Sequence, residues 1–196
     1  MSKILFGILA LSLFLFAEIK KGYYDSGELQ WEAPYKNDKR EGLGKEYYDS
    51  GELKSEAPYK NDKAEGLAKG YYDSGELQWE VPYKNDKREG LAKGYYKSSA
   101  LANETPYKND KAEGISKTYY KTGELQWEVP YKNGKTEGLG KQYYKSGALA
   151  KETTLKNGYA IKGIIYNQDG SKARNMTNAD FNNQGFKYKY LWGVSN

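Results

Sequence analysis

The sequence predicts an all-β fold: an elongated antiparallel β-meander of tandem hairpins, two strands per repeat, with an irregular C-terminal cap. Three observations lead to this prediction. A tyrosine pair recurs every 24 residues, each repeat holds two turn signals, and the runs between turns are about ten residues long. Such a period is typical of repeat proteins, in which each unit packs on its neighbours. The pairs are Tyr23-Tyr24, Tyr47-Tyr48, Tyr71-Tyr72, Tyr95-Tyr96, Tyr119-Tyr120 and Tyr143-Tyr144.

The two turn signals of each repeat are Ser-Gly and Asn-Asp, and the second becomes Asn133-Gly134 and Asn157-Gly158 in later repeats. These dipeptides favour tight hairpins because both central residues adopt a positive φ. If both loops are two-residue turns, Tyr48 lies opposite Leu53 and Trp127 lies opposite Gly140. We expect about 12 to 14 strands, and at ~4.8 Å per strand an array on the order of 60 Å long.

Alternation along the strands predicts two different faces. The aromatic face carries the Leu, Trp, Ala or Val, and Tyr side chains of each long strand, beside glycines such as Gly42. Trp31 is expected between Gly22 and Gly44, and Trp79 between Gly70 and Ala92, because rings packed over glycine stabilise a sheet. The Lys/Glu face is expected to pair a lysine with a glutamate in every hairpin, namely Lys21–Glu32, Lys45–Glu56, Lys69–Glu80, Lys93–Glu104, Lys117–Glu128 and Lys141–Glu152.

A second period of 48 residues overlies the first and indicates duplication of a two-unit block. It appears at two positions of the repeat, where the residues alternate from one unit to the next. The tryptophan position reads Trp31, Ser55, Trp79, Asn103, Trp127 and Lys151, and the position after Asp-Lys reads Arg40, Ala64, Arg88 and Ala112.

The composition excludes several kinds of catalytic chemistry. The chain has no histidine and no cysteine, so it has no imidazole base, thiolate nucleophile, Cys/His zinc site or disulfide. Acids such as Glu28 and Glu32 recur in each repeat opposite lysine, whereas a glycosidase site needs one pocket with two carboxylates. Each Asn-Asp-Lys loop has a single carboxylate, too few for calcium. We therefore expect no enzyme activity, no metal and no cofactor.

The net charge of +5 is too balanced for a nucleic-acid-binding protein. Its distribution is uneven: residues 23–94 carry a net charge of −4 and residues 95–196 a net charge of +7. Neutral drift of surface residues explains this difference, and docking of the basic half on an anionic polymer, lipid or acidic protein is the alternative. Any contact with a membrane is expected to be peripheral.

Residues 1–17 have the pattern of a signal peptide. Lys3 precedes a 13-residue apolar segment, Ile4 to Phe16, and Ala17 precedes a polar stretch, so cleavage is expected before Glu18. A membrane-spanning helix needs about 20 apolar residues, which makes an uncleaved anchor the weaker alternative. We therefore predict export to the periplasm, the cell surface or the medium.

The mature chain divides into repeats, residues 18–158, and a distinct tail, residues 159–196. Gly163 to Tyr166 with Asp169-Gly170 is interpreted as a worn seventh unit. Thr177 with Asp180 is typical of a helix start, and Gly185 of a helix stop. The run from Phe186 to Trp192 is expected to fold back and cap the edge of the sheet.

The recurring pattern YYxSGEL followed by ExPYKN, Lys and Glu-Gly resembles the bacterial variant of the MORN repeat, over roughly residues 19–170. The resemblance implies a β-hairpin repeat fold without catalytic residues. Many bacterial proteins of this type are labelled antitoxins of toxin–antitoxin systems, and others are secreted repeat proteins. The signal peptide distinguishes this chain from a cytosolic antitoxin.

The sequence predicts an exported, non-catalytic module that binds a protein partner at the cell surface or envelope, including contact with a host. One alternative is an immunity protein that neutralises a toxin. Another is a cell-wall or glycan-binding module, because choline- and glucan-binding repeats also use Tyr-Tyr and Gly-Trp hairpins, although in shorter units. The candidate binding residues are expected on the aromatic face, because Trp and Tyr side chains provide a large contact area with few rotatable bonds. They are Trp31, Trp79, Trp127, Tyr35, Tyr59, Tyr83, Tyr107 and Tyr131.

Overall fold

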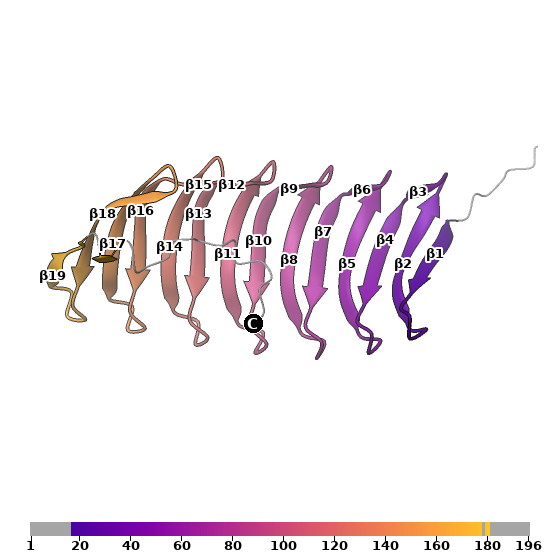
Figure 1. The fold of residues 1–196 in the computed structure, drawn as a ribbon, viewed down its shortest axis with the longest axis horizontal. Coiled ribbons are helices and arrows are strands. Elements are labelled where there is room, and N and C mark those ends of the chain that lie inside the picture. The colour runs from indigo at the N-terminus through magenta and orange to yellow at the C-terminus, as the bar shows by residue number, and fades with distance from the viewer. Residues whose placement is uncertain (1–16, 178, 181–196) are drawn as a thin grey trace, which may run out of the picture.

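The computed structural model describes residues 17–177 and 179–180, which form one open antiparallel sheet (Figure 1). The described sheet has 19 strands, and the strands follow one another across it in chain order. Five of them are two-residue strands beside the Asn-Asp turns, which leaves 14 principal strands. The expected β-meander is therefore confirmed.

Each of the first five repeats contributes three strands in a fixed order, and the sixth contributes the first two of them. A strand of six residues comes first: β1 (Glu18–Tyr23), β4 (Gly42–Tyr47), β7 (Gly66–Tyr71), β10 (Gly90–Tyr95), β13 (Gly114–Tyr119) and β16 (Gly138–Tyr143). A strand of eight residues follows: β2 (Leu29–Lys36), β5 (Leu53–Lys60), β8 (Leu77–Lys84), β11 (Leu101–Lys108), β14 (Leu125–Lys132) and β17 (Leu149–Lys156). The two-residue strands are β3 (Lys39–Arg40), β6 (Lys63–Ala64), β9 (Lys87–Arg88), β12 (Lys111–Ala112) and β15 (Lys135–Thr136). The last described strands are β18 (Tyr159–Tyr166) and β19 (Lys172–Asn175).

The Ser-Gly turns are three-residue loops, so the expected two-residue turn is wrong at this end of the hairpin. The Tyr48 amide donates to the Glu52 carbonyl at 2.8 Å, and Gly51 closes the loop with φ of 93°. This combination is a tight turn followed by a glycine bulge. Tyr48 therefore lies opposite Glu52, not opposite Leu53 as expected.

The Asn-Asp and Asn-Gly turns have the expected two residues. Asn133 and Gly134 have φ of 52° and 79°, and the turn places Tyr131 opposite Thr136. Asn37 and Asp38 show the same geometry in the first unit, with φ of 52° and 59°. The asparagine and aspartate side chains tolerate this left-handed backbone, which explains why glycine is not needed in every unit.

A glycine bulge follows each of the first five of these turns and moves the register by two residues. Gly138 has φ of 118°, and a Cβ on it would lie 3.1 Å from Cγ of Pro130. Beyond this bulge Trp127 lies opposite Gln142, so the expected pairing with Gly140 is wrong.

The same shift corrects the neighbours of the other two tryptophans. Trp31 lies between Gly22, as expected, and Glu46 in place of Gly44. Trp79 lies between Gly70, as expected, and Gly94 in place of Ala92. Gly42 was expected on the aromatic face, but a Cβ there would lie 2.8 Å from Cγ of Pro34, a residue of the Lys/Glu face.

The most buried side chains are small and lie on the aromatic face. Ala92 and Ala112 are 0% and 1% exposed, and they form a cluster with Val81 and Tyr107. Trp79, Tyr83 and Tyr131 pack against this cluster. Because the strands make their main contacts with neighbours along the chain, stability is expected to come mostly from bonds between adjacent units.

The C-terminal part of the described sheet contains the expected worn unit. The Asn167 amide donates to the Ser171 carbonyl and Gly170 has φ of 84°, the geometry of the Ser-Gly turns. Between β17 and β18 the hairpin turns at Asn157-Gly158.

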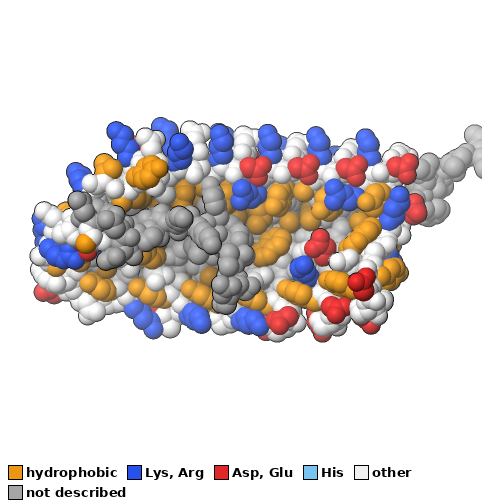
Figure 2. Space-filling view, viewed as in Figure 1, with side chains coloured by type: hydrophobic (Ala, Val, Ile, Leu, Met, Phe, Trp, Pro, Cys, Tyr) orange, Lys and Arg blue, Asp and Glu red, His pale blue; other side chains and the backbone are white. Residues whose placement is uncertain are grey.

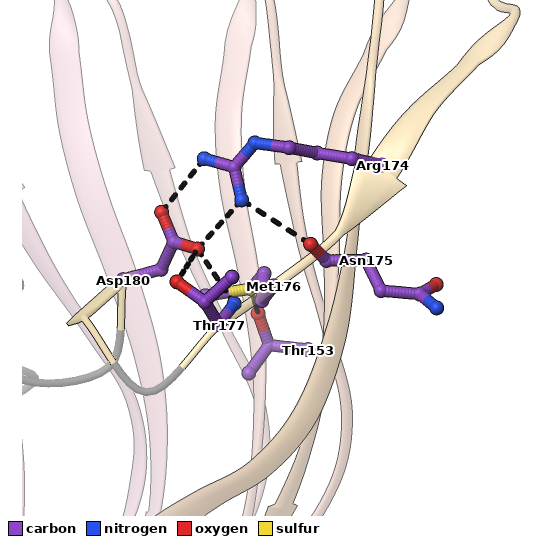
Figure 3. A network of polar contacts seen from close by, with 6 residues as sticks. All are labelled: Thr153, Arg174, Asn175, Met176, Thr177 and Asp180. Atoms are coloured by element: carbon purple, nitrogen blue, oxygen red, sulfur yellow. Dashed lines mark hydrogen bonds and ion pairs between the residues drawn. The ribbon is translucent and has the colours of Figure 1, made fainter.

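The expected helix start at Thr177 is present (Figure 3). The Asp180 carboxylate accepts hydrogen bonds from the Thr177 amide at 2.6 Å and the Thr177 hydroxyl at 2.8 Å, and it forms an ion pair with Arg174 at 2.7 Å. Residues 179–180 are helical. The expected stop at Gly185 and the Phe186 to Trp192 strand lie outside the described residues, as does the signal peptide up to Phe16.

Among the described residues there is no helix with the length and apolar character that crossing a membrane requires.

Candidate functional site

From the second pair onward, the first tyrosine of each pair bonds to a carboxylate of the preceding unit. The Tyr47 hydroxyl, on β4, donates to the Glu32 carboxylate, on β2, at 2.8 Å. The same bond recurs at 2.8 or 2.9 Å in Tyr71–Glu56, Tyr95–Glu80, Tyr119–Glu104 and Tyr143–Glu128, and the worn unit repeats it in Tyr166–Glu152. These glutamates therefore have a structural role.

The second tyrosine of each pair bonds to the backbone of the following unit. The Tyr24 hydroxyl donates to the Tyr47 carbonyl at 2.6 Å. The other units repeat this bond at 2.7 or 2.8 Å, in the pairs Tyr48–Tyr71, Tyr72–Tyr95, Tyr96–Tyr119, Tyr120–Tyr143 and Tyr144–Tyr166. The recurring Tyr-Tyr motif thus links each hairpin to both of its neighbours.

Five of the six central glutamates of the Lys/Glu face lie between two lysines, and the sixth, Glu152, lies between Lys141 and Ile164. Glu80 is opposite Lys69 within its hairpin and opposite Lys93 in the next unit, and its Oε1 is 3.1 Å from Lys93 Nζ. The expected hairpin register is confirmed for all six Lys–Glu pairs. Three of the four ion pairs that this ladder forms among the described residues nevertheless cross between units: Lys69–Glu56, Lys93–Glu80 and Lys117–Glu104. The fourth, Lys21–Glu32, lies within a hairpin.

The ladder shifts the pKa values of its members. Burial, then the hydrogen bond to Glu80 and its negative charge, raises the pKa of Tyr95 to about 12. Burial alone would raise the pKa of Glu80, but the hydrogen bonds from Tyr95 and Lys93 outweigh it and lower that pKa. Both shifts favour a neutral tyrosine beside an ionised carboxylate, which is a structural hydrogen bond rather than a catalytic acid and base.

The carboxylates near the Asn-Asp turns also link adjacent units. The Asn109 amide donates to Glu89 at 2.7 Å, and the Ala64 amide donates to Asp86 at 2.6 Å. The Glu of each Glu-Gly bulge repeats the first bond, in the pairs Glu41–Asn61, Glu65–Asn85, Glu113–Asn133 and Glu137–Asn157. In the described chain no group of three or more His, Cys, Asp or Glu is arranged to hold a metal ion.

We expect Glu89→Ala to lower the free energy of unfolding by about 1 kcal/mol, because the Asn109 amide loses its partner in the preceding unit. Lys87→Ala, at an exposed position of β9, is the matched control and should change stability far less. Urea titration followed by circular dichroism measures both. Equal effects of the two substitutions would contradict a linking role for Glu89.

On the aromatic face, the indole rings of Trp31 and Trp79 lie directly over glycine. A Cβ added to Gly22 or Gly70 would overlap the ring opposite it. Trp127 instead faces Thr118 on that side. All three tryptophans are half-buried, and they occupy every second unit of the array.

The tyrosines of the aromatic face lie in one row, and cations stack on three of them. The Arg40 guanidinium is 4.0 Å from the Tyr59 ring, and the Arg88 guanidinium is 4.2 Å from the Tyr107 ring. Lys20 lies over the Tyr35 ring at 4.5 Å. Such contacts favour a ring that keeps one side against the sheet and turns the other to a cation.

Tyr83 and Tyr131, the other two candidates, pack with Trp79 against the buried cluster. Burial is the main cause that raises the pKa of Tyr83; Arg88 opposes the shift and Asp110 adds to it. The structure therefore places all eight predicted residues on one face. It brings Trp79, Tyr83, Tyr107 and Tyr131 together around the cluster and leaves Trp31, Tyr35 and Tyr59 in the first units.

A row of exposed aliphatic side chains on the Lys/Glu face was not among the predicted residues. They are between 41% and 59% exposed and recur every 24 residues. The signal was present in the sequence, since five of them directly follow Glu-Gly, where a solvated strand would carry a polar residue. The row consists of Ile19, Leu43, Leu67, Leu91, Ile115 and Leu139.

Figure 2 shows how apolar and charged side chains are distributed on one face of the sheet. Hydrophobic side chains form a band along the long axis, and charged side chains gather along the two edges where the turns lie. An extended band of this kind suits contact with an elongated partner rather than the enclosure of a small substrate.

The tandem hairpins and their repeated bonds between units define a β-hairpin repeat protein. The family described as MORN repeat variant matches residues 19–37, 40–61, 64–85, 88–109, 112–133 and 136–157, and the chain belongs to this family. The matches cover six repeats and end before the worn seventh unit. No curated protein matches the chain significantly.

Proposed function

We propose that this chain is an exported, non-catalytic repeat scaffold that binds a protein partner at the cell surface or envelope through its aromatic face. The observation that carries the proposal is that one set of side chains bonds the units together and a different set forms the aromatic face. The recurring tyrosine hydroxyls and carboxylates bond one unit to the next, whereas the Trp and Tyr rings of the aromatic face form a surface along the array, in which all of the candidate rings except the buried Tyr107 are half-buried.

The spacing of the tryptophans supports an extended partner. Trp31, Trp79 and Trp127 are four principal strands apart, which corresponds to roughly 19 Å between successive rings. A partner that touches several such positions gains affinity from multivalency even when each contact is weak. Tyrosines in the same row add contact area, because aromatic side chains are enriched in binding hot spots.

The start of the sheet supports export with cleavage. Strand β1 begins at Glu18, the residue that follows the predicted cleavage site. Cleavage there would remove Lys3 and the apolar segment and leave every described strand intact. N-terminal sequencing of the protein recovered from outside the cytoplasm tests this part of the proposal.

The partner is to be captured from envelope and host-surface extracts, identified by mass spectrometry and then titrated against purified variants. Trp79→Ser with Trp127→Ser should weaken binding about tenfold or more, as expected for hot-spot residues. Serine already occupies the equivalent position at Ser55. Two matched double variants act on the other face: Leu67→Ser with Leu91→Ser, and Glu80→Gln with Glu128→Gln. Circular dichroism confirms that each variant is folded.

Binding that depends on the leucines or glutamates, and not on the tryptophans, would contradict the assignment of the aromatic face. Capture of an exported toxin that the chain inhibits would support the immunity alternative. A tryptophan-dependent signal on a glycan array, without a protein partner, would support the glycan-binding alternative.

A further inference from the structure

The edge of the sheet formed by the Ser-Gly turns, here called the Ser-Gly edge, has one sign of charge in each half. The residue after each tyrosine pair is aspartate in the first three hairpins and lysine in the next three. All six side chains are exposed at the tips of the loops. They are Asp25, Asp49 and Asp73, then Lys97, Lys121 and Lys145.

Neighbouring residues strengthen this polarity. Three residues further on, the acidic half has Glu28, Glu52 and Glu76, and the basic half has Ala100, Glu124 and Ala148. Figure 2 shows acidic side chains along one half of the lower edge and basic side chains along the other.

The opposite edge, formed by the Asn-Asp and Asn-Gly turns, has a lysine at the same position in every unit. Each of its turns is preceded by a lysine, namely Lys36, Lys60, Lys84, Lys108, Lys132 and Lys156. The change of sign is therefore a property of the Ser-Gly edge and not of every exposed position in the repeat.

The change of sign also does not follow the duplication that produced the repeats. Copying a two-unit block gives alternation, as seen for Trp31, Ser55 and Trp79. On the Ser-Gly edge Asp25 and Asp49 agree, and the sign changes once, between Asp73 and Lys97. Simple copying of the 48-residue block would instead have made Asp49 and Lys97 alike.

We propose that the Ser-Gly edge binds a second copy of this chain in antiparallel orientation. A two-fold axis between the hairpins of Asp73 and Lys97 places the acidic half of each copy against the basic half of the other. Both halves have the same spacing, two principal strands or roughly 10 Å per hairpin, so all loops meet in register. The contacts are Asp25 with Lys145, Asp49 with Lys121, and Asp73 with Lys97, each formed twice.

A second copy fits this edge better than other partners for a geometric reason. A contact between two identical patches requires a surface that is complementary to itself under a two-fold rotation, and this edge meets that requirement. A uniformly charged polymer or membrane would be attracted to one half and repelled by the other. The Asp73–Lys97 ion pair, 2.9 Å within one chain, shows that such loop side chains reach a partner of opposite charge.

The contact involves exposed charges, so its strength must depend on salt. The Debye length falls from roughly 20 Å at about 0.02 M salt to roughly 4 Å at about 0.5 M. We therefore expect a dimer at low salt whose dissociation constant rises about tenfold or more at high salt. This inference is independent of the aromatic face and of the partner bound there.

The experiment is sedimentation velocity over a concentration series at both salt concentrations. It uses the full-length chain expressed with its N-terminal segment and purified in the form that the cell produces. One variant carries Asp25→Lys, Asp49→Lys and Asp73→Lys, and another carries Lys97→Asp, Lys121→Asp and Lys145→Asp. Each variant alone should be monomeric, and an equimolar mixture of the two should form a heterodimer at low salt.

A third variant, with Lys39→Asp, Lys63→Asp and Lys87→Asp on the opposite edge, changes charge by as much and should still dimerise. Circular dichroism verifies the sheet in every variant. A monomeric parent protein at low salt would overturn the proposal. So would dimerisation of either variant alone as strong as that of the parent, or a mixture that stays monomeric.

Discussion

Gly70→Ala is expected to lower the free energy of unfolding by about 2–3 kcal/mol, because the added Cβ would overlap the Trp79 indole. The backbone of Gly70 is not in the left-handed region, so the effect reports packing and not backbone strain. Trp79 packs against the buried cluster that contains Val81 and Ala92, so the ring cannot move aside freely. Urea unfolding followed by tryptophan fluorescence and circular dichroism measures the change.

Gly94→Ala is the matched control for this prediction. Gly94 occupies the same position one repeat later, and a Cβ there would meet the Asn103 side-chain amide at 2.8 Å. The amide is the end of a flexible side chain, so the substitution should cost less than half as much. In a Trp79→Ser background, where the ring is absent, Gly70→Ala should cost much less than it does in the parent. Equal costs for the two glycines would show that the ring does not determine stability here.

The prediction of the two faces succeeded although parts of the predicted register were wrong. The Glu-Gly bulge at Gly138 shifts the pairing of Trp127 by two residues, from Gly140 to Gln142. Side chains alternate with a period of two, so a shift of two residues keeps every side chain on its face. At the Ser-Gly end the extra loop residue is absorbed by a bulge, and Glu46 still lies opposite Ser55, as two-residue turns would require.

The bulges themselves could not be predicted from these residues alone. A glycine near the end of a strand is compatible with a simple turn, with a bulge or with an aromatic ring packed over it. Each of these arrangements needs a different backbone conformation. Gly51 and Gly138 have a positive φ, whereas Gly70 does not. Which use applies depends on the neighbouring strand, for example on Pro130 packing against Gly138.

The roles of the acids were only partly predictable. Alternation placed Glu80 opposite Lys69, and the structure confirms this. The bond from Tyr95 to Glu80 joins residues 15 apart across two units, so it depends on the corrected register between hairpins. The choice of the aromatic face as the binding surface, centred on Trp79 and Trp127, stays a prediction, and the exposed aliphatic row is its competitor.

The tyrosine–glutamate bonds predict that the sheet loses stability at alkaline pH. Burial, then the hydrogen bond to glutamate and its charge, raises the pKa of these tyrosines from 10.0 to about 12 in five units: Tyr47, Tyr71, Tyr95, Tyr119 and Tyr143. A raised pKa in the folded state means that the neutral form stabilises the fold. This contribution is complete below pH 10, where the unfolded chain also holds its protons, and is lost as the pH rises through about 12.

The size of this effect follows from the number of units. The shift of about two pKa units corresponds to about 2.7 kcal/mol, and partial solvent exposure reduces this value to about 1 kcal/mol for each tyrosine. Five such bonds give a loss on the order of 5 kcal/mol, which is comparable with the whole stability of many domains. We therefore expect the sheet to unfold cooperatively between pH 10 and about 12, as measured by circular dichroism and urea titration at each pH.

The control is a variant with phenylalanine at Tyr47, Tyr71, Tyr95, Tyr119 and Tyr143. It lacks the hydrogen bonds to glutamate, so it should be less stable than the parent at pH 8. It also has no phenol to ionise at these positions, so its stability should change much less between pH 10 and about 12. A variant that loses as much stability as the parent over this range would show that the tyrosine–glutamate bonds do not cause the alkaline sensitivity.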